Sequence, residues 1–419
     1  MQEKVPFSQV IVTAFLITGG LVGAGILALP VNTGLAGFVP SLVGMAVIGG
    51  AMFFTAVVLG YEATLTREAT FNFPSLYGNY LGSTGKWIAI FANLLILYGL
   101  LTAYLTGATS ITASLFGLSS LKPVVMVVFS LGLSALTVAG VSIVAKYNAL
   151  LTVMMLTAFT AIVLMAEGHV QVQRMTYTDW SFLPSTAPIV VCAFYFHNII
   201  PTVCRSMKWN HSVVWKTILI GMLLGFAMNA LWIQASVGAL PLKGGDVSLF
   251  SAFEKSLPAT VPLSEVIGSH IFTIAALLFS LLAITTSYLA LGVGFMGFIQ
   301  DLMVNHVKKS HRALNIAICF APPLLISLVY PGIFLKAMNI VGGVGIVVLF
   351  GILPSIIYLM RVRSFPDKSS RPGQVGMLAL GGAIMLLFGA FLVLELAQEF
   401  GLLHISPGVE HWTAGVVHR

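Results

Sequence analysis

Long apolar runs, separated by short polar segments, follow one another along the whole chain. A membrane-spanning helix needs about 20 predominantly apolar residues, and eleven runs of this kind are present. They cover residues 8–34, 38–64, 86–115, 121–140, 145–166, 186–204, 213–238, 264–303, 312–331, 333–360 and 375–402. The eighth run is too long for one crossing, so we expect its first part to lie at the membrane surface. The pattern predicts an all-α polytopic membrane protein with eleven transmembrane helices.

The composition supports this interpretation, because 58% of the 419 residues are hydrophobic and only 8% are charged. A soluble domain carries about 25% charged residues. The net charge of +7 does not indicate a nucleic-acid partner, since the basic residues of membrane proteins collect in cytoplasmic loops. A cytoplasmic N-terminus places 14 of the 20 Lys and Arg residues on the cytoplasmic side. We therefore expect the N-terminus in the cytoplasm and the C-terminus outside.

The sequence predicts a single membrane-embedded unit. Its longest loops are 167–185 and 239–262, and the first apolar run is predicted to be a retained span because it continues into the body of the protein. We expect one transmembrane domain over residues 1–404 and a polar tail outside the membrane over 405–419. The cysteines are interpreted as small packing residues; they are Cys192, Cys204 and Cys319.

Two short glycine motifs resemble phosphate-binding loops but lack the required context. The sequence GVGFMG at 292–297 matches G-x-G-x-x-G, yet it lies within an apolar helix and follows no strand. Helix packing explains it better. The sequence GSTGKW at 82–87 lacks the first glycine of a P-loop, because Tyr80 occupies that position. We expect neither a cofactor nor enzymatic chemistry.

Two of the predicted helices contain residues that interrupt a helix near the middle of the membrane. The first carries GGLVGAGILALP at 19–30, and the sixth carries CAFYFHNIIP at 192–201. Glycine and proline disfavour helix, and free backbone groups are costly in lipid unless they line a cavity. The breaks fall in the first helix of two sets of five, 8–166 and 186–360, whose topology is inverted because five is odd. Paired interruptions in inverted repeats indicate a transporter binding site at the midplane, and the helix at 375–402 is additional.

Several motifs resemble those of the hydroxy/aromatic amino acid permease family. They are GAGILALP (23–30), YEA (61–63), LYGLLTAYLTGA (97–108), FHNIIP (196–201), LWIQASVGALP (231–241), ITTSYLALGVGFMGFIQDLM (284–303) and FAPPLLISLVYPGIFLKAM (320–338). The resemblance implies the LeuT-type fold of the amino acid–polyamine–organocation superfamily: two inverted five-helix repeats with broken helices 1 and 6, plus one extra helix. FHNIIP is more similar to the tyrosine/tryptophan branch than to the serine/threonine branch. GFIQD (297–301) departs from the aromatic branch, which leaves the exact substrate open.

The resemblance also implies a function and a site. It implies proton-driven uptake of an aromatic amino acid, tryptophan or tyrosine, across a bacterial cytoplasmic membrane. The break at Gly23, with the amides of Ala24 and Gly25, would bind the substrate carboxylate. The carbonyl of Leu21 and carbonyls of 194–197 would bind its ammonium, and a Cβ on Gly25 is expected to meet the substrate. The other implied pocket residues are Tyr98, Thr102, Phe194, Phe196, His197, Asn198 and Asn339.

The coupling ion is left open between a proton and sodium. His197 lies near the midplane and titrates in a range that suits proton exchange, and Glu62 is a second, weaker candidate. Some proton-coupled members of the superfamily carry a lysine in helix 5, where this chain has Met155. A sodium site made of carbonyls and hydroxyls would use Gly19, Val22, Ala283, Thr286 and Ser287. The alternatives are a sodium-coupled symporter, a serine/threonine-type permease and, in a different class, an amino acid sensor without transport.

Overall fold

The computed structural model describes residues 5–67, 72–139, 141–308, 311–364 and 371–408. Ten helices in these ranges are long and apolar enough to cross a membrane, and a further pair, bent by 56° at a short break, completes an eleventh span. The described part of the chain is all-helical, without strands. The predicted fold class and the predicted count of eleven spans are therefore confirmed. The final residues of the predicted tail, 409–419, lie outside the described residues.

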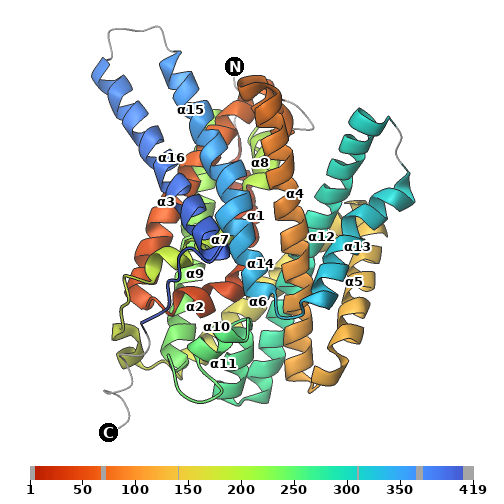
Figure 1. Cartoon of the computed structure of the whole chain (residues 1–419), viewed down its shortest axis with the longest axis vertical. Helices are drawn as coiled ribbons and strands as arrows, with labels where there is room; N and C mark the ends of the chain where they lie inside the picture. The colour runs from red at the N-terminus through yellow and green to blue at the C-terminus, as the bar shows by residue number, and fades with distance from the viewer. Residues whose placement is uncertain (1–4, 68–71, 140, 309–310, 365–370, 409–419) are drawn as a thin grey trace.

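The spans follow one another with short connections (Figure 1). In chain order they are α1 (Phe7–Leu21) with α2 (Gly25–Thr33), α3 (Phe38–Thr66), α4 (Phe73–Leu115), α5 (Lys122–Ala139), α6 (Val141–Glu167), α7 (Ala187–Ala193) with η4 (His197–Ile199) and α8 (Ile200–Ser206), α9 (His211–Ala239), α12 (His270–Leu302), α13 (Arg312–Val329), α14 (Phe334–Ile340) with η6 (Val341–Ile352) and α15 (Leu353–Arg363), and α16 (Arg371–Glu399). The short elements between them are η1 (Ser119–Leu121), η2 (Val172–Thr176), η3 (Leu183–Thr186), α10 (Leu249–Glu254), α11 (Thr260–Ile267) and η5 (Met303–Val307).

Two glycines with positive φ explain where the structure departs from simple apolar runs. Gly268 (φ 62°) separates α11 from α12, so the first part of the eighth run is a separate short helix. Gly82 (φ 66°) kinks α4, which begins at Phe73, well before the apolar run at 86. The motif GSTGKW therefore marks a helix kink. Only glycine adopts positive φ at little cost, which explains both positions.

Two pairs of corresponding helices in the predicted repeats have equal lengths. Corresponding helices match: α3 and α9 each have 29 residues, and α5 and α13 each have 18. The odd number of spans places the N-terminus at one end of the molecule and the C-terminal segment at the other (Figure 1). We call the end that carries the N-terminus, the α12–α13 connection and the α15–α16 connection the N-terminal side.

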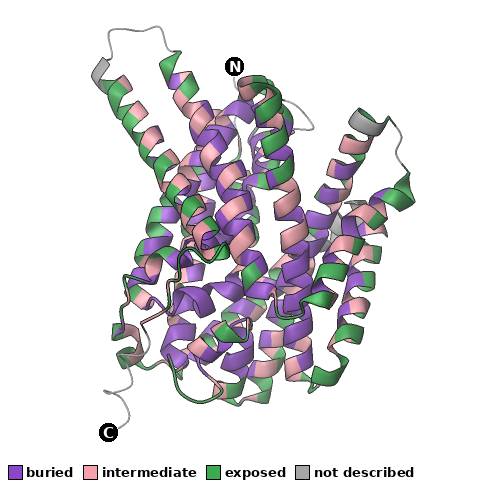
Figure 2. Ribbon diagram, in the orientation of Figure 1, coloured by how far each residue is buried: buried purple, intermediate pink, exposed green. Residues whose placement is uncertain are grey.

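Burial divides the helices into a core and a lipid-facing shell (Figure 2). The most apolar window of the broken sixth helix, Leu183–Ser206, is 78% buried, whereas that of Gly373–Glu399 is only 17% buried. The broken helix therefore lies at the centre of the fold, and the extra helix α16 lies at its edge.

A buried ion pair ties three spans together on the N-terminal side. Glu62 at the end of α3 pairs with Arg361 of α15, whose Nε lies 2.9 Å from Oε1. The Tyr80 hydroxyl of α4 donates to Glu62 Oε2 (2.9 Å), and Arg361 Nη2 donates to both Glu62 Oε2 (3.1 Å) and the Tyr80 oxygen (2.8 Å). The Glu62 side chain is only 4% exposed. Glu62 is thus held in a structural network.

We expect Glu62→Gln to destabilise the fold, because it leaves Arg361 without its carboxylate partner. The expected loss is about 1–3 kcal/mol, measured as a lowered thermal unfolding temperature of the purified protein. Glu399→Gln is the control, because Glu399 pairs with Lys336 at 3.0 Å and that lysine side chain is 59% exposed. An exposed ion pair of this kind contributes about 0–1 kcal/mol to stability. Equal shifts in the two variants would contradict the structural role of Glu62.

Candidate transport site

The first helix break spans residues 22–24, between α1 and α2. The N–H of Ala24 donates across the break to the Ser287 hydroxyl of α12 (3.2 Å). A Cβ on Gly23 would lie 2.7 Å from the same oxygen, so glycine is required for this approach. The carbonyls of Leu21 and Val22 accept no backbone hydrogen bond from any described residue. The break therefore presents free backbone acceptors beside α12.

The second break lies in the sixth span, between α7 and α8, and includes the turn η4. It faces the first break, since a Cβ on Gly25 would lie 3.3 Å from the Cys192 carbonyl and 3.5 Å from the Ala193 Cα at the end of α7. Gly25 therefore packs on α7 backbone, and a side chain at this position would meet α7 first. It is the first residue of α2, so it belongs to a helix and not to the non-helical segment of the break.

A small cavity of about 140 Å³ lies between α1, the sixth-span break, α4, α6 and α12. The residues implied to bind the substrate head group, Leu21, Gly23, Ala24 and Gly25, are not among those that line it. Its lining combines glycine backbone, aromatic rings and a few polar groups. The lining residues are Leu16, Gly19, Gly20, Leu100, Tyr104, Thr152, Tyr195, Phe196, Asn198, Ile199, Thr286, Ser287, Ala290 and Leu291. A concave site with apolar walls and few polar groups is typical of small-molecule binding.

A vestibule of about 580 Å³ continues from this cavity toward the N-terminal side. The two spaces share Tyr195, Asn198, Ala290 and Leu291. The other vestibule residues are Asn72, Phe73, Pro74, Ser75, Asn93, Leu97, Gly294, Gly297, Phe298 and Asp301. Because Asn72 and Asp301 lie at helix ends on the N-terminal side, the cavity opens toward that side.

Two of the three glycines of GVGFMG, Gly294 and Gly297, line this vestibule. A Cβ on Gly294 or Gly297 would have no neighbour within 4 Å, whereas one on Gly292 would meet Thr137 at 2.9 Å. The packing interpretation therefore holds for Gly292 alone. The other two glycines leave helix backbone bare along the wall of a water-accessible space.

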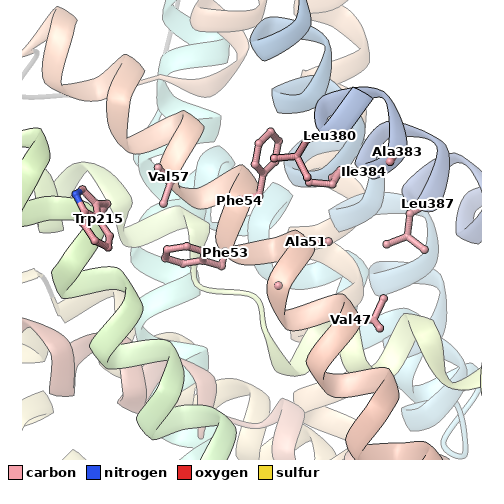
Figure 3. Close-up of a pocket in the computed structure, with 11 residues that line it drawn as sticks. Val47, Ala51, Phe53, Phe54, Val57, Trp215, Leu380, Ala383, Ile384 and Leu387 are labelled. Carbon is pink, nitrogen blue, oxygen red and sulfur yellow. The ribbon is translucent and has the colours of Figure 1, made fainter. Parts of the chain in front are cut away.

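A different cavity, on the outside of the fold, has the wrong chemistry for a polar solute. Figure 3 shows a groove of about 660 Å³ between α3, α9 and α16, with apolar side chains and the Trp215 ring around it. It lies on surfaces that face the membrane. We therefore assign the candidate site to the central cavity.

Four of the implied pocket residues point elsewhere. The Tyr98 hydroxyl donates to the Ile318 carbonyl of α13 (2.9 Å), and Thr102 donates to the Tyr98 carbonyl (2.8 Å). Phe194 packs toward α3 and α9, with its ring centroid 6.3 Å from that of Phe226. Asn339 lies in α14 on the helix face between Lys336 and Gly343, which contact α16.

The structure assigns the cavity to the other face of α4. Leu100 and Tyr104 line the cavity, and Asn93 and Leu97 line the vestibule; the spacing of these four residues follows one helical stripe. The sequence shows this spacing, but the residues around the neighbouring stripe through 98 and 102 are equally apolar. The sequence therefore does not show which of the two stripes faces the cavity. Tyr195 also lines both spaces, although the resemblance implies only its neighbours Phe194 and Phe196 as side-chain contacts. Phe196 and Asn198 do line the cavity, as the resemblance implies.

His197 lies behind the cavity wall. It is fully buried, and its Nε2 lies 3.0 Å from the Thr55 hydroxyl of α3. Since Thr55 donates to the Met52 carbonyl (3.1 Å), the arrangement is satisfied when Nε2–H donates to Thr55. The other ring nitrogen, Nδ1, has no hydrogen-bond partner among the described residues. His197 therefore links the helix-6 break to α3.

The implied sodium ligands partly converge. Gly19, Thr286 and Ser287 line the cavity, and Val22 and Ala283 are fully buried next to them in sequence. Thr286 donates to the Leu282 carbonyl (2.8 Å) of its own helix, which leaves the lone pairs of the Thr286 hydroxyl oxygen available.

Met155, at the position where some proton-coupled members carry a lysine, is a buried core residue of α6.

The fold and the site together define a polytopic transporter with two broken helices around a central cavity. The chain belongs to the tryptophan/tyrosine permease family, whose model matches residues 7–395.

Individual proteins support this assignment. The chain is 28% identical over 334 residues to the tyrosine-specific transport system 1 of Haemophilus influenzae, covering 79% of this chain and 83% of that protein. It is 26% identical to the tryptophan-specific transport protein of the same organism, covering 97% and 96%. The crystal structure of MhsT in complex with L-phenylalanine superposes with a TM-score of 0.62 at 13% identity, covering 94% of this chain and 100% of that one. The last comparison concerns the fold alone.

We expect Gly23→Ala to destabilise the break, because its methyl group would lie 2.7 Å from Ser287 Oγ. Overpacking of this kind costs about 1–3 kcal/mol, and thermal unfolding of the purified protein measures it. Gly23→Ala combined with Ser287→Ala should recover part of the loss. Gly382→Ala on α16 is the control, because a Cβ there meets nothing within 4 Å. An unchanged unfolding temperature for Gly23→Ala would contradict the close approach.

We expect a cysteine at Gly297 to react with a membrane-impermeant maleimide, because this position lines the vestibule. The native protein provides a quiet background, since Cys192, Cys204 and Cys319 are all buried. Ala283→Cys on the same helix is the control and should stay unmodified, because Ala283 is fully buried. Labelling at 283 as fast as at 297 would show that the vestibule is not the open path.

Proposed function

We propose that this protein is a secondary active transporter that carries an aromatic amino acid, tryptophan or tyrosine, together with a proton. It works by alternating access in a bacterial cytoplasmic membrane, with the N-terminus in the cytoplasm. The observation that carries the proposal is the cavity beside α1 and the helix-6 break, which continues into a vestibule toward the N-terminal side. Transport then needs a second state in which the same cavity opens toward the other side.

The helix-1 break supports recognition of the amino acid head group. At the N-terminus of α2 the N–H groups of Ala24, Ile26 and Leu27 are already hydrogen-bonded. The Gly25 N–H and the positive end of the helix dipole are therefore the features that suit a carboxylate. The free carbonyls of Leu21 and Val22 suit the ammonium. In this proposal Gly23 keeps the break close to Ser287, and Gly25 lets α2 begin against α7.

The aromatic lining supports a ring-bearing substrate. Tyr104, Tyr195 and Phe196 line the cavity from two elements, and offset or edge-on ring packing is worth about 0.5–1.5 kcal/mol beyond burial. Asn198 adds a polar group where the cavity meets the vestibule. Small polar substrates such as serine gain nothing from these rings.

We assign proton coupling to His197. Its Nδ1 is buried without a partner, and charging a buried, unpaired group is costly. A proton can therefore bind at Nδ1 only when the helix-6 break moves and admits water. This requirement would link protonation to the conformational change.

Sodium coupling is the second candidate, because Gly19, Thr286 and Ser287 meet at one end of the cavity. Carbonyl and hydroxyl oxygens suit a hard cation. Sodium would then stabilise the contact between the helix-1 break and α12.

Uptake of radiolabelled tryptophan into proteoliposomes tests the proposal, with pH and sodium gradients imposed one at a time. We expect accumulation on an inward proton gradient, displaced by unlabelled tyrosine far better than by serine or glutamine. His197→Gln should keep exchange and lose pH-driven accumulation. Displacement by serine better than by tyrosine would overturn the substrate assignment.

The same assay separates the alternatives. Accumulation that needs external sodium and disappears in Thr286→Ala with Ser287→Ala would establish sodium coupling in place of protons. Tryptophan binding without any flux would indicate a sensor. Retention of pH-driven accumulation by His197→Gln would remove His197 from the coupling mechanism.

A further inference from the structure

An apolar groove runs along the membrane-facing side of α3. It has a volume of about 660 Å³ and lies between α3, α9 and α16. In Figure 3, Phe53 and Val57 of α3 face Trp215 of α9, while Phe54 and Val47 lie toward α16. The α16 wall is formed by Leu380, Ala383, Ile384 and Leu387. The groove is therefore bounded by three helices and filled by none of them.

A second groove lies on the other side of Phe53. It has a volume of about 300 Å³, between α3 and α9, and shares Gly50 and Phe53 with the first groove. A Cβ on Gly50 would have no neighbour within 4 Å. The absence of a side chain at Gly50 therefore leaves open space on α3 where the two grooves meet. Phe194, the first residue after α7, also lines the second groove. The Phe53 ring contributes to the walls of both grooves.

Together, the two grooves extend over about the thickness of one leaflet along α9. Trp215, near the start of α9 on the N-terminal side, lines the first groove, and Phe226 lines the second. The helix between these two residues rises roughly 16 Å at 1.5 Å per residue. Half of a hydrocarbon core of about 30 Å is close to this distance. The grooves therefore match acyl chains that enter from the leaflet on the N-terminal side.

The surface end of the grooves is basic and aromatic. Lys216 is exposed, and its Nζ lies 5.7 Å from the centroid of the Trp215 ring. The His211 ring packs edge-on against Tyr61 at 5.0 Å, one turn beyond the groove residue Val57. Trp and Tyr are enriched at the headgroup level of membranes. A positive side chain at this level attracts anionic lipid headgroups.

We propose that this face binds an anionic phospholipid of the leaflet on the N-terminal side, with one acyl chain on each side of Phe53 and its phosphate at Lys216. The chain in the second groove contacts Phe194, so the lipid supports the helix-6 break from behind. This site is separate from the central cavity, and its test does not depend on the transported substrate.

Thermal unfolding of the purified full-length protein, titrated with phosphatidylglycerol or phosphatidylcholine in detergent, tests the proposal. Phosphatidylglycerol should stabilise the protein at lower concentration than phosphatidylcholine. Lys216→Gln should weaken the phosphatidylglycerol effect about five-fold, because one basic residue near a membrane surface is worth about that factor. Lys243→Gln is the matched control, since Lys243 is also exposed and lies 5.5 Å from the Phe250 centroid, away from the groove.

A larger side chain in the groove provides a second, independent test of the lipid site. Gly50→Leu should abolish the preference for phosphatidylglycerol, while Gly382→Leu on α16, which also has open space around its Cβ, should retain it. Equal stabilisation by both lipids in the native protein, or equal losses in the Lys216 and Lys243 variants, would overturn the proposal. A lipid-free dimer that Gly50→Leu converts to monomer would assign the face to a second copy instead. Should Gly50→Leu fail to fold, the two lysine variants decide alone.

Discussion

The need to pair backbone hydrogen-bonding groups inside a bilayer governs this structure. A continuous helix meets that need by itself, whereas a broken one exposes N–H and C=O groups that lipid cannot satisfy. The molecule places both breaks at its centre, where the Ser287 hydroxyl accepts from the Ala24 N–H and the second break lines a small cavity. The surrounding helices enclose the breaks: α9 packs on α1 and α2, and α5 and α16 complete the shell.

The same enclosure explains why glycine is so frequent near the cavity. Gly23 admits the Ser287 oxygen and Gly25 admits the α7 backbone, so two interrupted helices approach within contact distance. Farther along α12, Gly294 and Gly297 have the opposite function, because they leave free space in the vestibule. Glycine therefore closes the structure at the breaks and opens it along the path to the N-terminal side. Sequence composition does not distinguish these two uses.

Polar residues in the membrane show a similar division. Glu62 and Arg361 bind each other and Tyr80, which fixes α3 to α15 on the N-terminal side. His197 binds Thr55 and connects the helix-6 break to α3. α3 thus contacts the ion pair at one end, the broken helix near its middle and the apolar grooves on its outer face. Movements of the helix-6 break and of the surrounding lipid would therefore both act on α3.

The sequence by itself determined the eleven spans, the two breaks and the family, because hydrophobic length, glycine and proline act locally along the chain. Only the tertiary structure decided which side of each helix faces the cavity. α4 is apolar on all sides, so the stripe of Tyr98 was as plausible as that of Tyr104 until α12 and α13 were in place. His197 was expected in the cavity for its chemistry, and packing turned it toward Thr55. Rotation about a helix axis depends on neighbouring helices, and an apolar sequence carries little information about it.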